Sequence, residues 1–149
     1  MILRERRPSD FAELCEIDRL CFPPGIAYPP QDLAHWLRQR GSFVIVAEDE
    51  EKQKVAGFIL SRKQHGSSGH IITVDILPEY RRCGLGTALI ERAHERLKRM
   101  EARRVRLEAS VENPSAVAFY QKLGYQIVGR IPRYYLDSID AWVMSKELT

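Results

Sequence analysis

Two arginines and two glycines stand in a spacing that suits phosphate binding. The stretch VDILPEYRRCGLGTA, residues 74–88, holds Arg81 and Arg82 followed by Gly84 and Gly86. Backbone N–H groups at the start of a helix, together with the positive end of the helix dipole, bind phosphate. Glycines let the backbone approach such a ligand, and arginines add charge. The spacing therefore predicts a phosphate-binding loop, although an ordinary turn before a helix accounts for it equally well.

The residues after Gly86 exclude two familiar nucleotide-binding motifs. A P-loop requires Gly-Lys-Ser/Thr, whereas Thr87 follows Gly86 directly. A dinucleotide-binding fingerprint requires a third small residue, and Leu89 at that position is too large. A pyrophosphate site of a third kind remains.

Two side chains further along the chain are suited to acid–base chemistry. Glu108 stands near the middle of an apolar predicted strand, where alternation directs it away from Leu107 and Ala109. Tyr120 follows on the next predicted helix. A carboxylate can take a proton from an attacking amine, and a phenol can give one to a leaving group. The structural alternatives are a solvent-facing Glu108 paired with Arg106, and a half-buried tyrosine with a satisfied hydroxyl.

The elements that must position these residues alternate between strand and helix patterns. Apolar residues at helical spacing predict a helix over residues 85–100, and it lies between predicted strands at 70–77 and 105–111. Strand, helix and strand in this order indicate a right-handed parallel crossover. The other expected strands lie at residues 2–6, 43–47, 55–63, 125–131 and 141–145, and the other helices begin near residues 10, 30 and 113. The order β-α-α-β-β-β-α-β-α-β-β predicts an α/β protein with a mixed sheet covered by helices.

The composition is that of an ordinary globular protein whose length suits one domain. We expect the 149 residues to form a single domain over residues 1–149. The 23 basic and 20 acidic residues leave a formal net charge of +3, which is too mild to indicate nucleic acid. The basic run at residues 92–106 is interleaved with glutamates, which favours a solvated helix face. We therefore expect no nucleic-acid partner.

The sequence shows no sign of a membrane span, a secretion signal or a metal site. It has no run of about 18 apolar residues, and its first residues are charged, without an apolar signal core. Cys15, Cys21 and Cys83 make an odd number with no paired metal spacing. We therefore expect a reduced, cytoplasmic setting, with no membrane partner and no metal.

The glycine loop and a second, downstream motif together resemble the GCN5-related N-acetyltransferases. The loop segment is Val74-Asp75-Ile76-Leu77-Pro78 with the Arg-x-x-Gly-x-Gly pattern, and the second motif is LEASVEN at residues 107–113, followed by residues 116–120 and 123–125. Both motifs, at this separation, are far more specific than either alone. The resemblance covers most of the chain and is closest to the RimI-like branch, which acetylates protein N-termini. It implies a mixed, mostly antiparallel sheet of about seven strands with one parallel, splayed pair and four flanking helices.

The resemblance also implies an activity and a set of site residues. The expected reaction moves acetyl from acetyl-CoA to a primary amine by direct attack in a ternary complex. Family members carry a base glutamate at the position of Glu108 and a tyrosine that meets the thioester sulfur at the position of Tyr120. The residues implied for acetyl-CoA binding are Val74, Asp75, Ile76, Arg81, Arg82, Cys83, Gly84, Leu85, Gly86, Thr87 and Asn113.

The acceptor implied by the RimI-like branch is the N-terminal α-amine of a protein. Residues 133–135 and 140–144 are similar to segments of that branch, and Tyr135 is expected to line a peptide slot with Phe22 and Tyr28. The tryptophan that often follows residues 21–23 in the branch is absent, so the preferred first residue of the acceptor stays open.

Several alternatives stay open at the level of sequence. The acceptor could instead be a small-molecule amine or a lysine side chain, and the chain could be a non-catalytic acyl-CoA-binding module. Asp75 either faces the incoming amine or lies on the other face of the sheet beside an arginine. The sequence does not distinguish a monomer from a homodimer.

Overall fold

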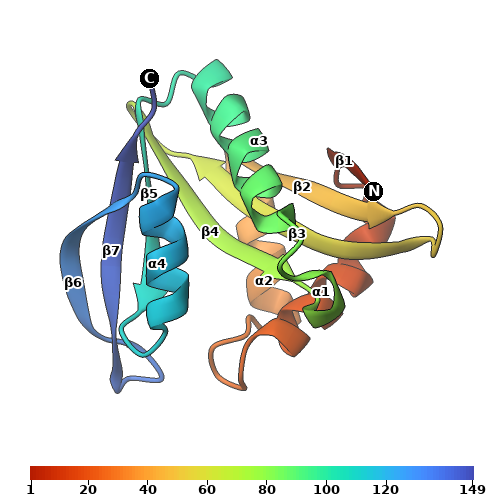
Figure 1. Cartoon of the computed structure of the whole chain (residues 1–149), viewed down its shortest axis with the longest axis horizontal. Helices are drawn as coiled ribbons and strands as arrows, with labels where there is room; N and C mark the ends of the chain where they lie inside the picture. The colour runs from red at the N-terminus through yellow and green to blue at the C-terminus, as the bar shows by residue number, and fades with distance from the viewer.

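The computed structural model describes all residues from 1 to 149 and contains one seven-stranded sheet with helices on both faces (Figure 1). The strand order is β1-β2-β3-β4-β5-β7-β6, and only β4 and β5 run parallel. The strands are β1 Ile2–Glu5, β2 Ser42–Asp49, β3 Lys54–Lys63, β4 Ser68–Ile76, β5 Arg104–Ser110, β6 Gln126–Tyr135 and β7 Ile139–Glu147. The helices are α1 Phe11–Cys21, α2 Pro30–Arg38, α3 Leu85–Arg99 and α4 Pro114–Lys122. The predicted order of elements and the single parallel crossover are confirmed.

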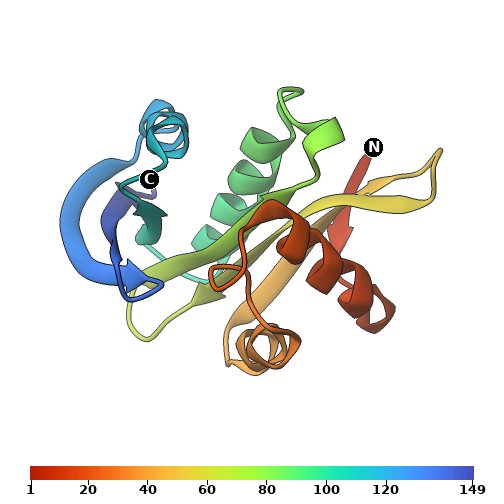
Figure 2. The same cartoon turned by 90° about the horizontal axis from the view of Figure 1, so that it is seen from below.

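Helices cover both faces of the sheet (Figure 2), and an apolar core lies on each face. Helix α3 presents Leu89, Ala93 and Leu97 to the sheet at intervals of four residues, so that one apolar stripe is fully buried. Helices α1 and α2 cover the other face, where Leu14 and Leu33 are fully buried. None of the helices is long and apolar enough to span a membrane.

The parallel strands β4 and β5 separate soon after they begin (Figure 1). They pair only where residues 68–70 lie beside residues 104–106, and no ladder continues beyond His70. In the pairing of β3 with β4 the register jumps from Thr73 to Ile71, so Ile72 has no partner on β3. Such a β-bulge bends and twists its strand, and this one lies at the point where β4 leaves β5. The splay that the family resemblance implies is therefore present.

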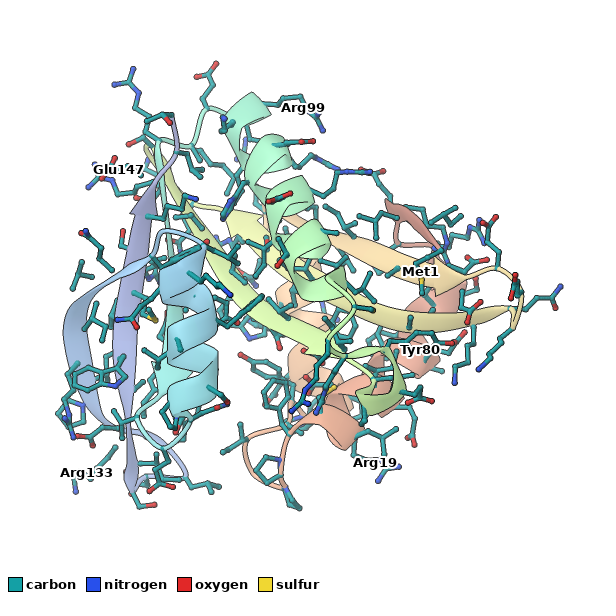
Figure 3. The ribbon with its side chains drawn as sticks, in the orientation of Figure 1. Met1, Arg19, Tyr80, Arg99, Arg133 and Glu147 are labelled. Carbon is teal, nitrogen blue, oxygen red and sulfur yellow. The ribbon has the colours of Figure 1, made fainter.

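The last hairpin is longer than the sequence pattern predicts. Residues 132–140 were expected to form a connection, but β6 continues to Tyr135 and only three residues separate it from β7. Pro132 lies within a strand because β6 is the edge of the sheet, where a missing N–H need not break a ladder bond. Arg133 has a left-handed φ of 52° where the β6–β7 register shifts, near the free end of the hairpin (Figure 3).

Candidate functional site

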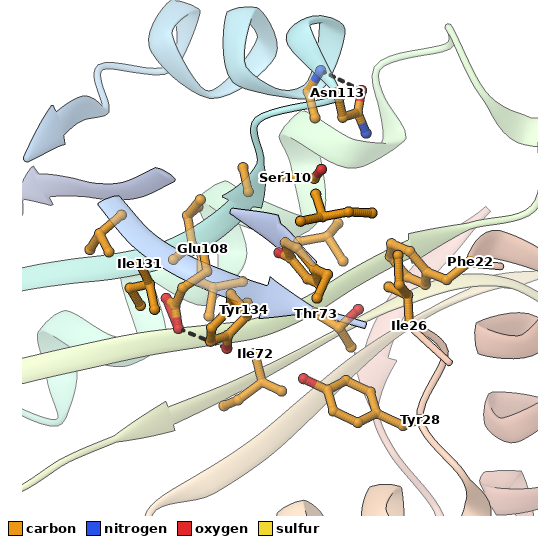
Figure 4. Close-up of a pocket in the computed structure, with 18 of the residues that line it drawn as sticks. Phe22, Ile26, Tyr28, Ile72, Thr73, Glu108, Ser110, Asn113, Ile131 and Tyr134 are labelled. Carbon is orange, nitrogen blue, oxygen red and sulfur yellow. Dashed lines mark hydrogen bonds between the residues drawn. The ribbon is translucent and has the colours of Figure 1, made fainter. Parts of the chain in front are cut away.

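The splay between β4 and β5 opens a cavity of about 760 Å³ with a mostly apolar lining (Figure 4). Its walls come from the α1–α2 loop (residues 22–29), the two splayed strands, α4 and the β6–β7 hairpin. Seven of the sequence-predicted site residues line it: Phe22, Tyr28, Val74, Glu108, Asn113, Tyr120 and Tyr135. Asp75, Ile76 and residues 81–87 lie outside this lining, at and beyond the end of β4.

Glu108 is held by two side chains that sequence analysis did not connect to it. Its carboxylate lies 2.9 Å from His70 Nε2 and accepts a hydrogen bond of 3.3 Å from the Tyr134 hydroxyl (Figure 4). The Glu108 side chain is only 9% exposed, and that of His70 is 8% exposed. The solvent-facing alternative for Glu108 is therefore wrong, and its partner is His70 rather than Arg106. The arginine instead donates to the Gln64 side chain at 2.7 Å.

The surroundings of Glu108 keep it ionised in spite of its burial. Burial raises the pKa of the Glu108 carboxyl, but the His70 hydrogen bond and charge, the Arg106 charge and the Tyr134 hydroxyl together outweigh it. The pKa therefore lies below its ordinary value. At neutral pH the carboxylate is charged and is able to accept a proton within an apolar cavity.

Tyr120 lies in α4 with its ring against Tyr125, at a centroid distance of 5.8 Å. Burial, and then the nearby Asp75 charge, raise the pKa of Tyr120 to about 12. The hydroxyl is therefore protonated at neutral pH and is able to donate a proton rather than accept one. This state suits the acid role that the sequence suggests, on the side of the cavity formed by α4.

The glycine loop has the backbone geometry of an anion site. Arg82 and Gly84 both have left-handed φ values, of 64° and 83°. The first intrahelical hydrogen bond of α3 runs from the Ala88 N–H to the Gly84 carbonyl over 3.1 Å. Three backbone N–H groups lack an intrahelical acceptor because they precede that bond: those of Leu85, Gly86 and Thr87. These donors stand at the positive end of a 15-residue helix, so the loop fits the diphosphate of acetyl-CoA.

The two glycines of the loop are required for different reasons. A Cβ on Gly84 would meet nothing within 4 Å, so its glycine serves the left-handed backbone and leaves open space above the loop. A Cβ on Gly86 would lie 3.2 Å from the Ile76 side chain and 3.3 Å from the Phe119 ring. Gly86 therefore allows the start of α3 to pack closely against β4 and α4.

Polar groups that suit the remainder of the cofactor lie along β4 and at the start of α4. Arg81 Nε donates to the Ile76 carbonyl at 2.9 Å, which ties this arginine to the end of the strand. Beyond His70, the edge of β4 that faces the splay makes no ladder bonds, so its backbone groups near Val74 are available to an extended ligand. Asn113 caps α4 by accepting the Ala116 N–H at 3.2 Å, as the sequence predicts, and this leaves its amide N–H groups free.

Asp75 lies on the other face of the sheet, as one of the two sequence alternatives has it, but the partner of its carboxyl group is not an arginine. Its side chain is fully buried on the face of the sheet covered by α1, where its main partner is the Asp18 carboxyl and the Arg81 charge acts on it more weakly. The Thr73 hydroxyl donates to it at 2.5 Å. Only its backbone is in a position to contact a ligand in the splay.

The predicted acceptor residues lie on two segments that face each other across the cavity. Phe22 and Tyr28 belong to the α1–α2 loop, and Tyr135 ends β6. The cavity also has walls that the sequence analysis missed, including Ile26, Leu136 and the indole of Trp36, whose ring lies 6.3 Å from that of His70. The sequence places His70 at the start of the strand that leads into the glycine loop. The register of that strand with β5 was not predictable from the sequence.

Comparisons with known proteins agree with this geometry. A model of the acetyltransferase (GNAT) family matches residues 11–125. The chain belongs to this family. An N-alpha-acetyltransferase of Sulfurisphaera tokodaii is 32% identical to it, over 98% of this chain and 92% of the relative. An N-alpha-acetyltransferase 30 of Schizosaccharomyces pombe is 31% identical, over 72% of this chain and 73% of the relative.

Solved structures share the fold over nearly the whole chain. Ard1 from Thermoplasma volcanium superposes with a TM-score of 0.87 and 25% identity, covering 99% of this chain and 97% of that one. The ribosomal-protein-S18-alanine N-acetyltransferase of Escherichia coli has a TM-score of 0.85 and 21% identity, covering 99% and 94%, which shows the fold. The GNAT chain described here is an acetyl-CoA-dependent N-acetyltransferase.

Proposed function

We propose that this GNAT enzyme acetylates the N-terminal α-amine of a protein, with Glu108 as general base and Tyr120 as general acid. The observation that carries the proposal is an apolar slot that ends on an ionised, buried carboxylate. Phe22, Tyr28 and Tyr135 wall the slot, and Glu108 lies within it. The names of the relatives, N-alpha-acetyltransferases matched over most of their length, support the same acceptor.

The properties of Glu108 favour an α-amine over a lysine. A carboxylate whose pKa is lowered is a weak base, and a lysine ammonium with a pKa near 10 gives up its proton reluctantly. A peptide α-amine has a pKa near 8, so a substantial fraction is already neutral at physiological pH. Glu108 then needs only to take the proton released as the nitrogen attacks, directly or through one water. His70 and Tyr134 fix the direction of its carboxylate.

The donor half of the reaction uses the other residues of the cavity. Acetyl-CoA supplies a thioester whose carbonyl is attacked and whose thiolate departs. The loop of residues 81–87 is proposed to hold the diphosphate, and the backbone near Val74 and the Asn113 amide to hold the pantetheine arm. Tyr120, whose hydroxyl is protonated at neutral pH and whose pKa burial raises to about 12, is proposed to give its proton to the thiolate.

Matched peptides read by mass spectrometry test the acceptor directly. One peptide of a pair has a free N-terminus and no lysine, and the other has a blocked N-terminus and one internal lysine. The proposal expects a mass gain of one acetyl group on the first and none on the second, across a restricted set of first residues. Acetylation of the lysine peptide alone, or of neither in spite of measured acetyl-CoA binding, would contradict it.

A further inference from the structure

Two carboxyl groups lie fully buried behind the cavity, and the reaction as described uses neither. Asp18 belongs to α1 and Asp75 to β4, and each side chain has no exposed surface. One oxygen of each has a donor: Asp18 accepts the Tyr28 N–H at 2.6 Å, and Asp75 accepts the Thr73 hydroxyl at 2.5 Å. The remaining oxygens, Asp18 Oδ1 and Asp75 Oδ2, are buried and have no other protein donor.

The Asp18 carboxyl is the side chain that acts most strongly on Asp75, and each of the two groups keeps one buried oxygen without a donor. The titratable groups around them are Cys15 and Cys21 of α1, Tyr28 of the α1–α2 loop, Arg81 after β4 and Tyr120 of α4. Arg81 is the one cation among these groups, and it cannot neutralise two buried charges. Two carboxylates in such a position do not both ionise, whereas a single proton between them satisfies both remaining oxygens.

We propose that Asp18 and Asp75 share one proton, and that this pair positions the acceptor loop against the donor strand. The proton stays bonded to one oxygen and hydrogen-bonds to the other, so the pair carries one negative charge. Its Asp18 end holds the backbone of Tyr28, the last cavity-lining residue of the α1–α2 loop. Its Asp75 end belongs to β4, between Val74 and Ile76.

Two further observations support this positioning role. Cys21 Sγ at the end of α1 donates to the Ile76 carbonyl at 3.3 Å, so the loop is attached to the same strand at its start as well. Burial, and then the Asp18 carboxyl, raise the pKa of the Asp75 carboxyl well above its usual value. Because the pKa of Asp75 is raised, its proton, and with it the contact to Asp18, is lost as the pH rises through that raised value.

Asparagine substitutions separate proton sharing from simple burial. In Asp75→Asn the amide oxygen still accepts from Thr73 and the amide N–H donates permanently to Asp18, so the pair and its single charge survive. In Asp18→Asn the roles are reversed: the amide oxygen accepts the Tyr28 N–H, and the amide N–H donates to Asp75. The double variant turns two N–H₂ groups toward each other and breaks the pair, although each single change is tolerated.

Three measurements on the full chain test the proposal. Only the third of them rests on the proposed function, because it uses a peptide acceptor. The infrared spectrum of the wild type at pH 7 is expected to contain a protonated-carboxyl C=O band that both single variants lack. Amide hydrogen exchange at Tyr28 is expected to be equally slow in the wild type and the single variants, and about tenfold faster in the double variant. The KM for an acceptor peptide is expected to rise about tenfold in the double variant only, with kcat and acetyl-CoA affinity within about twofold.

Each outcome decides something. Absence of the carboxyl band in the wild type, or exchange at Tyr28 that is unchanged in the double variant, overturns the pair. If the double variant does not fold, Asp18→Ala, which removes the acceptor of the Tyr28 N–H, is compared with Asp18→Asn. Equal exchange in those two variants overturns the proposal. If the carboxyl band and the exchange pattern are as expected but no peptide is acetylated, the result contradicts the proposed acceptor and still supports the carboxyl pair.

Discussion

The two sides of the splay are built in different ways. The proposed donor side is centred on one continuous stretch, residues 74–87, to which Asn113 and Tyr120 are added. The properties of this stretch depend on backbone conformation: left-handed residues, unpaired N–H groups and a helix N-terminus. The proposed acceptor side is assembled from the α1–α2 loop, Glu108 and the β6–β7 hairpin, which are distant in sequence and meet through side chains. Substitutions on the donor side are therefore expected to act through the main chain and through charge. A substitution on the acceptor side is expected to remove only the contacts of the side chain that is changed.

Gly84→Glu should cause the largest change. The new carboxylate lies where phosphate is proposed to bind, and a left-handed φ of 83° strains any side chain, so acetyl-CoA affinity should fall by on the order of 100-fold or more. Gly66→Glu is the matched control, because Gly66 also has a left-handed φ, of 74°, and open space around it, in the turn before β4. Titration calorimetry with acetyl-CoA measures both variants. Equal affinities would remove the phosphate-loop assignment.

Glu108→Gln should lower turnover by about 10²–10⁴-fold while acetyl-CoA affinity stays unchanged, because only the acceptor side loses its base. The loss of turnover relative to the wild type should grow as pH falls, since more of the amine then carries a proton that a base must remove. Steady-state kinetics from pH 6 to pH 9 measure the effect, with Glu147→Gln, at the far end of β7, as the control (Figure 3). A kcat equal to that of the wild type across this range would show that Glu108 is not the base.

Tyr135→Ala should raise the KM of the acceptor peptide about tenfold, as expected for the loss of an aromatic wall, with acetyl-CoA affinity unchanged. Tyr135→Phe keeps the ring and should stay close to the wild type. Initial rates at varied peptide and saturating acetyl-CoA measure both variants. An equal loss in donor affinity would mean that the two sides of the splay are not separable.

His94 should have the smallest effect on catalysis and a clear effect on stability, because it connects α3 to the start of the last hairpin. Its Nε2 lies 2.6 Å from the Tyr125 hydroxyl, and burial, then Lys146 and Lys98, lower the pKa of His94 to about 4. Since an unfolded histidine titrates near 6.5, the folded state should lose stability as pH falls from about 6.5 to about 4.

Urea unfolding at pH 7 and pH 5 measures this dependence. His94→Gln keeps a hydrogen-bonding group without the titration, so its stability should change less between the two pH values than that of the wild type. His65→Gln, at an exposed position in the turn before β4, is the control and should behave as the wild type. An identical pH dependence in all three proteins would contradict the assignment.

The parts of both sides that have local signals were predictable from the sequence. Periodicity predicted α3, Pro114 and Asn113 predicted the start of α4, and alternation gave Glu108 its face, since these patterns come from the geometry of a single helix or strand. The splay itself entered through the family resemblance. Its physical counterpart, the bulge at Ile72, has no signature in the sequence of β4.

The amino-acid sequence alone determined the order of the elements, the glycine loop and the type of residue available for acid–base chemistry. Only the tertiary structure decided that His70 and Tyr134 hold Glu108, that Asp75 meets Asp18, and that β6 extends to Tyr135. The physical reason is range. Backbone propensity and side-chain period act over a few residues, whereas strand register and the pairing of buried polar groups depend on how distant segments pack together.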